Sequence, residues 1–130
     1  MLNKLGLGTA QFGAPYGITN YSGKVEEEAV VAILNFCADQ QISYLDTAAA
    51  YGDSHRVLGS CDLRPFRVST KTKIASDGAG DRFTTIVKCV EQNISELGLD
   101  SIHSILIHDA WNIDSKDGNE VYKALRFCKD

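Results

Sequence analysis

Short β-like runs alternate with helical stretches along the whole chain, and this alternation limits the fold more than any other feature of the sequence. Each run of apolar and β-branched residues is followed by a segment whose apolar residues recur at three- and four-residue steps. Such alternation is typical of a parallel sheet whose strands are joined by crossover helices. It occurs four times, with strands expected at Leu5–Thr9, Ile42–Asp46, Phe66–Lys71 and Ile102–His108. The sequence therefore predicts an α/β fold of about four βα units.

The helices are expected at residues 25–40, 54–58, 82–97 and from about Asn119 onward. The third of these is the most regular, because its apolar residues form one stripe at Phe83, Ile86, Val87, Val90, Ile94 and Leu97. Asp81 stands at its N-cap position and Gly98 at its C-terminal stop. Residues 76–80 are Gly-rich and are expected to form a linker.

The length of the chain permits one domain but not a closed eight-unit barrel. It has 130 residues, 44% of them hydrophobic, whereas such a barrel typically needs about 250 residues. The last helical pattern reaches Asp130 without a Gly, Asn or Pro stop signal. We therefore expect residues 1–130 to form one domain, a half-barrel that is a fragment of a longer chain.

Charge and cysteine spacing exclude several classes of function. The net charge of -4 gives no basic patch for nucleic acid or an anionic membrane, and the N-terminus lacks the long apolar run of a signal peptide. A cytoplasmic location is expected by default. The four cysteines are scattered without a Cys-x-x-Cys pair, and no Asp, Glu or His cluster has metal-ligand spacing. We therefore expect no metal, and reduced, mainly buried thiols.

Four polar residues lie at or just after the C-terminal ends of predicted strands. Asp46 ends the second strand and Tyr51 follows in its loop, while Lys71 and His108 end the third and fourth strands. In parallel α/β folds the ligand site forms at these strand ends, because the loops there are free to vary. We therefore expect the four side chains to meet at one mouth of the fold.

These side-chain types suit acid catalysis at a carbonyl group. When a hydride adds to the carbon, a positioned acid must protonate the oxygen, and a free tyrosine titrates near about 10. An ammonium about 4 Å from a phenolate stabilises it by on the order of 4 kcal/mol at an effective dielectric near 20. Lys71 would supply this charge to Tyr51, with Asp46 holding the ammonium. His108 would donate a hydrogen bond that orients the substrate carbonyl.

Each of these residues also has a simpler interpretation. Asp46 could cap a helix, Tyr51 could be a surface aromatic, and His108 could be an ordinary strand-end residue. Lys73 shares strand parity with Lys71 and competes for its role. Two further interpretations concern other positions: His55 and His103 are expected to be exposed or structural, and Trp111 either lines a substrate pocket or covers the core.

At these residues the sequence resembles the aldo-keto reductase family. The matching stretches are LGLGTAQFG, ISYLDTAAAYGDSHRVLG, VSTK and ILIHD, and Asp-Thr-Ala-x-x-Tyr-Gly is the most specific of them. The resemblance implies about half of a (β/α)8 TIM barrel in which NADPH reduces an aldehyde or ketone. It also implies that Asp46, Tyr51, Lys71 and His108 form the catalytic tetrad, with Tyr51 as the acid. The chain departs from the family at His55, where Glu is usual, and at Gln41, where Gly is common.

The resemblance further implies that most of the cofactor site lies outside this chain. The family's phosphate, adenine and nicotinamide-stacking contacts come mainly from later strands, so Gly8, Thr9 and Asp46 remain as candidates for the nicotinamide ribose. The expected partners are accordingly a small carbonyl substrate and a missing C-terminal half. The alternative is a non-catalytic half-barrel that pairs with itself or another protein as a binding or structural module, because an open sheet leaves two edges and an apolar face to cover.

Overall fold

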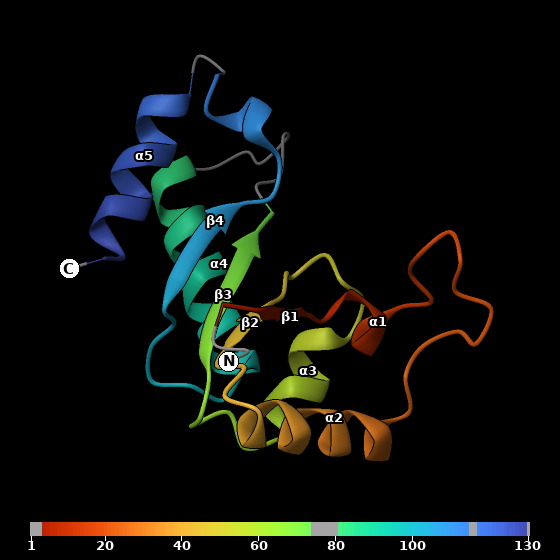
Figure 1. Ribbon diagram of the computed structural model, residues 1–130. Coiled ribbons are helices and arrows are strands. Elements are labelled where there is room, and N and C mark those ends of the chain that lie inside the picture. Colours follow the sequence, from red (N-terminus) through yellow and green to blue (C-terminus); the bar gives the residue numbers. More distant parts are fainter. Residues whose placement is uncertain (1–3, 74–80, 115–116, 130) are drawn as a thin grey trace.

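The four predicted strands form one parallel sheet. The computed structural model describes residues 4–73, 81–114 and 117–129. The strands are β1 (Gly6–Gly8), β2 (Tyr44–Asp46), β3 (Arg67–Thr72) and β4 (Ser104–Ile107), and each of their bounds lies within two residues of the predicted one. They lie side by side in chain order and every neighbouring pair is parallel (Figure 1). Sequential parallel order is the arrangement of consecutive strands in a (β/α) barrel.

Helices follow the strands as the periodicity predicts. The predicted helices are α2 (Glu27–Asp39), α3 (Ser54–Gly59), α4 (Arg82–Glu96) and α5 (Gly118–Phe127). Two short helices were not predicted, α1 (Ala10–Gly13) and the 3₁₀ helix η1 (Ala110–Asn112). The predicted ends of α4 are confirmed, because the Asp81 side chain accepts from the Thr84 amide and Gly98 takes a φ of +63°. The predicted linker at 76–80 lies outside the described residues. Within the described ranges, no helix is both long and apolar enough to cross a membrane.

The helices pack against one side of the sheet and leave the strand-end residues of the other side accessible. Leu45 of β2 and Val68 of β3 lie in the core with residues of α2 and α3, while α4 and α5 form a second cluster beside β4. Because side chains alternate along a strand, the neighbours of these core residues point to the opposite side. Asp46 follows Leu45 directly and Lys71 lies three residues after Val68, so both belong to the opposite side, where Asp46 is exposed and Lys71 is half-buried.

Candidate active site

The ends of β2 and β3 bring Asp46 and Lys71 into contact. The Lys71 ammonium lies 2.7 Å from each carboxylate oxygen of Asp46 and 3.2 Å from the backbone carbonyl oxygen of Thr47. Burial is the largest influence on the pKa of Lys71 and would lower it, but the contacts with Asp46 and Tyr51 outweigh burial and raise that pKa above its usual value. Lys71 is therefore held as a charged ammonium at the mouth of the sheet.

The loop after β2 places the Tyr51 phenol beside this ammonium. The distance from Lys71 Nζ to Tyr51 Oη is 3.4 Å, and the ammonium also lies 5.2 Å from the centre of the Tyr51 ring. Because a lysine ammonium has donors and no acceptor, the phenol oxygen accepts in this contact. The phenol's own proton is then free to be donated to another group.

His108, the fourth residue of the predicted group, directly follows β4. Its ring lies 6.2 Å from the Tyr51 ring, centre to centre, in an edge-on arrangement, and its backbone amide donates to the Thr72 carbonyl. Within the described part of the chain, its buried Nδ1 has no hydrogen-bond partner. The structure thus brings all four predicted residues to one mouth.

Two glycines allow the Tyr51 loop to pack against the end of α1. A Cβ on Gly13 would lie 1.7 Å from the backbone oxygen of Tyr51, and one on Gly52 would lie 2.2 Å from the backbone oxygen of Gly13. Gly52 also has a φ of +57°, which residues with side chains rarely adopt. The backbone contact between α1 and the loop therefore fixes the base of the Tyr51 side chain.

The three residues predicted to contact a cofactor differ in what they offer. At Gly8 an added Cβ would meet nothing within 4 Å, so a ligand can approach this backbone closely. The Asp46 carboxylate is 52% exposed and can accept further hydrogen bonds. The Thr9 hydroxyl, by contrast, is fully buried and donates to the Asp46 carbonyl oxygen. Gly8 and Asp46 are thus accessible to a ligand, whereas Thr9 offers no side-chain contact.

The structure also decides between several of the alternative interpretations. Lys73 is exposed, and it is Lys71 that pairs with Asp46. His55 is buried and structural: its Nε2 lies 2.8 Å from Thr70 Oγ1, while its Nδ1 lies 3.4 Å from a Glu96 oxygen without a well-aligned hydrogen bond. Trp111 is 83% exposed, so the prediction that it covers the core is wrong. Its role in a substrate pocket remains a prediction.

Tyr16 lies close to the candidate site, and sequence reasoning missed it. Its ring is 6.4 Å from the Tyr51 ring, centre to centre, and 64% of the residue is exposed. The loop that carries it is held by Gln11, whose side chain donates to the Tyr16 carbonyl, and by an ion pair between Lys24 and Asp53. The available signal was its place in the loop after the first strand, since all such loops meet at one mouth.

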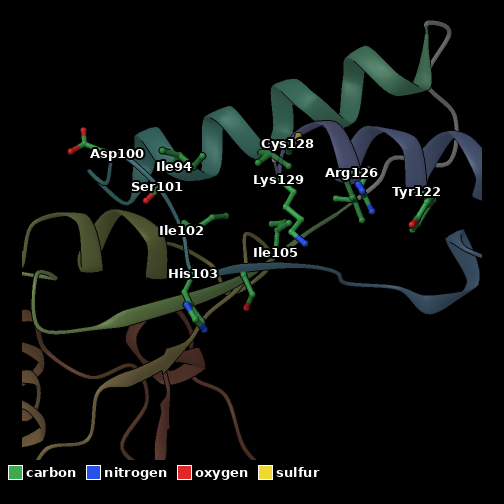
Figure 2. A pocket seen from close by; sticks show the side chains of 13 residues that line it. Ile94, Asp100, Ser101, Ile102, His103, Ile105, Tyr122, Arg126, Cys128 and Lys129 are labelled. Carbon is green, nitrogen blue, oxygen red and sulfur yellow. The ribbon is translucent and has the colours of Figure 1, made fainter.

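A groove of about 690 Å³ lies away from the four-residue site (Figure 2). It is bounded by β4, the segment before it, the C-terminal half of α4 and α5, and its apolar lining includes Ile94, Ile102 and Ile105. His103, Arg126 and Lys129 also line it. None of the four predicted catalytic residues lines it, so the groove is a separate surface beside β4, an edge strand of the described sheet.

Comparison with known proteins identifies the family. A sequence model of a protein family, described as "Aldo/keto reductase family", matches residues 4–130. A putative aldo-keto reductase from Pseudomonas aeruginosa superposes with a TM-score of 0.73 at 25% identity, covering 95% of this chain and 50% of that one. An aldo-keto reductase from Bacillus halodurans, in its holo form, superposes with a TM-score of 0.71 at 20% identity, covering 96% of this chain and 41% of that one.

Another similar structure is a complex with NADP. The Bombyx mori aldo-keto reductase in complex with NADP gives a TM-score of 0.56 at 21% identity, over 79% of this chain and 33% of that one. No curated protein sequence matches this chain. The chain thus spans half or less of the length of these solved structures.

Proposed function

Since the chain belongs to the aldo/keto reductase family, we propose that it supplies the proton-transfer half of an enzyme that reduces aldehydes or ketones with NADPH. The observation that carries the proposal is the 3.4 Å contact between the Tyr51 phenol and a Lys71 ammonium that is already paired with Asp46. Family members generally use a nicotinamide cofactor on small carbonyl compounds. Full activity is proposed to need residues beyond these 130, since the chain matches only part of each relative.

Tyr51 is proposed to donate its proton to the carbonyl oxygen of the substrate. As the proton leaves, negative charge develops on the phenol oxygen, and Lys71 lies close enough to stabilise it. For unit charges 3.4 Å apart, this attraction is about 5 kcal/mol at an effective dielectric near 20, and smaller where water enters. Asp46 keeps the ammonium in place and compensates its partial burial.

The remaining two roles concern orientation and binding. His108 is proposed to donate a hydrogen bond to the carbonyl oxygen, which both orients the substrate and polarises the bond that is reduced. The exposed side of Gly8 and the Asp46 carboxylate are proposed to contact the nicotinamide ribose. NADPH, when bound, supplies the hydride that the carbonyl carbon accepts.

A matched pair of lysine variants tests the proposed function. The protein is expressed from its native gene, and NADPH consumption is followed with a panel of aldehydes and ketones. Lys71→Met is expected to lower kcat by about 100-fold or more, because the phenolate loses its stabilising charge. Lys73→Met is expected to keep normal turnover, since Lys73 is exposed and Lys71 makes the contact with Asp46. Equal effects of the two substitutions would refute the assignment.

One observation favours a second function, pairing with another copy as a half-barrel module. In the described sheet β1 and β4 are the edge strands, and the apolar groove lies directly beside β4. Open edges and apolar grooves favour association. Analytical ultracentrifugation is expected to show a dimer that Tyr122→Glu, at the groove, disrupts and that Tyr21→Glu, in the exposed loop after β1, does not. A monomer at all concentrations would exclude this module.

A further inference from the structure

Three buried hydroxyl groups connect the elements that carry the proposed proton-transfer residues. Thr9 follows β1, Thr47 follows β2 and Ser54 begins α3, and each is 0% exposed. The Ser54 hydroxyl oxygen lies 3.1 Å from Thr9 Oγ1 and 3.2 Å from Thr47 Oγ1. Because buried hydroxyl groups need hydrogen-bond partners, this cluster fixes how the three elements meet.

The contacts of the three hydroxyl groups show which residue is central. A hydroxyl has one proton to donate. The Thr9 hydroxyl group can donate to the Asp46 carbonyl oxygen at 3.1 Å, and the Ser54 hydroxyl group can donate to the Thr9 carbonyl oxygen at 3.1 Å. In the contact between Ser54 and Thr47, either hydroxyl group can be the donor. Ser54 is thus the member of the cluster whose hydroxyl group contacts the residues that follow both β1 and β2.

Ser54 is also connected to both partners of the 3.4 Å contact. Its backbone amide donates to the Tyr51 carbonyl oxygen at 3.1 Å. Its hydroxyl oxygen lies 3.2 Å from Thr47 Oγ1, and the Thr47 carbonyl oxygen accepts a hydrogen bond from the Lys71 ammonium at 3.2 Å. One residue therefore ties the backbone beneath the phenol to an acceptor of the ammonium.

We propose that Ser54 is a positioning residue whose hydroxyl group sets the separation between the Tyr51 phenol and the Lys71 ammonium. The proposal rests on the proposed function. Without this hydroxyl, the buried Thr47 hydroxyl loses its hydrogen-bond partner, and the Thr9 carbonyl oxygen keeps, among the described residues, only the Phe12 amide as a donor. Since unpaired buried polar groups are costly, the ends of β1 and β2 shift to find other partners, and the ammonium shifts with them.

Two serine-to-alanine variants separate positioning from general structural support. Ser54→Ala removes the central hydroxyl, whereas Ser60→Ala removes a hydroxyl that donates to the Val57 carbonyl just after the same helix. In the native-gene protein, Ser54→Ala is expected to lower kcat about tenfold or more while KM for the carbonyl changes less than about twofold. Ser60→Ala is expected to change neither.

A titration that needs no activity gives the second measurement. With ¹⁵N-labelled lysine, the Lys71 signal, assigned with Lys71→Met, is followed against pH by NMR. Ser54→Ala is expected to move this titration and Ser60→Ala to leave it unchanged. If Ser54→Ala does not fold, Thr47→Val decides the question, because it breaks the same contact and keeps a similar shape; it is expected to move the titration in the same direction.

The outcomes distinguish this proposal from the proposed function. A folded Ser54→Ala or Thr47→Val protein with the wild-type Lys71 titration and wild-type kcat would overturn the positioning role, whatever Tyr51 does. If Lys71→Met kept its activity, the proposed function would fail, and the Lys71 titration would still decide whether Ser54 positions the ammonium.

Discussion

Gly13→Ala is expected to displace the loop that carries Tyr51. The added Cβ would lie 1.7 Å from the Tyr51 backbone oxygen and 2.4 Å from the Ser54 backbone nitrogen, and both are atoms that no side-chain rotation can move. Restoring a contact of 3.0 Å requires a displacement of about 1.3 Å. The φ angle of Gly13 is not among the positive ones, so this effect is steric and not conformational.

A shift of this size is large compared with the geometry of the site. The contact between Tyr51 and Lys71 is already 3.4 Å, at the long end of a hydrogen bond, so a further ångström would break it. We expect kcat to fall about 100-fold and the free energy of unfolding to fall by about 1–3 kcal/mol, the usual cost of overpacking.

Urea unfolding and NADPH-dependent turnover measure the two effects. Gly6→Ala is the matched control, because its added Cβ would lie 3.3 Å from Tyr44 Cβ and the neighbour needs to move by only a few tenths of an ångström. The control is expected to keep its activity and to change stability by less than about 1 kcal/mol. Wild-type stability and turnover in Gly13→Ala would refute the packing of the Tyr51 loop against α1.

Two further predictions concern charged and buried groups. Asp46→Asn is expected to lower the pKa of Lys71, because the substitution removes the carboxylate that counteracts the effect of burial. ¹⁵N NMR of the lysine side chain measures this pKa. Asp53→Asn is the control, since it removes the carboxylate partner of Lys24 and leaves Asp46 in place. Burial lowers the pKa of His55 in the folded protein despite the nearby Glu96. Below about pH 6.5, His55 binds a proton in the unfolded chain but not in the folded protein. The free energy of unfolding is therefore highest above this pH and falls as the pH drops toward the lowered pKa of the folded protein. Urea unfolding of His55→Gln is expected to show a weaker loss over this range, and an identical pH dependence in both proteins would count against a buried neutral His55.

The meeting of Asp46, Tyr51, Lys71 and His108 was predictable because it follows from simple rules. Parallel strands in chain order place all their C-terminal ends on one side, and strand parity fixes which side chains share a face. Lys71 and Lys73 share that parity, so parity alone could not choose between them. The choice depends on the register of β2 against β3, which pairs Asp46 with Ser69 and brings Lys71 to the end of β2.

The surroundings of these four residues could not be predicted in the same way. Thr9, Thr47 and Ser54 are ordinary residues in the sequence, and Thr9 and Ser54 are 45 residues apart when their hydroxyl groups meet. Tyr16 reaches Tyr51 through a loop with no periodic pattern. Such contacts depend on how loops and helices pack in three dimensions, and no local pattern records that packing.

Whether Tyr51 donates the proton to the carbonyl oxygen is tested most directly by Tyr51→Phe in the protein expressed from its native gene. The substitution removes one oxygen and keeps the ring, and Tyr21→Phe in an exposed loop is the control. NADPH-dependent reduction of carbonyl compounds is expected to be abolished in Tyr51→Phe, while NADPH binding, followed by fluorescence titration, stays nearly unchanged. Near-normal turnover in Tyr51→Phe would contradict the role of Tyr51 as the acid.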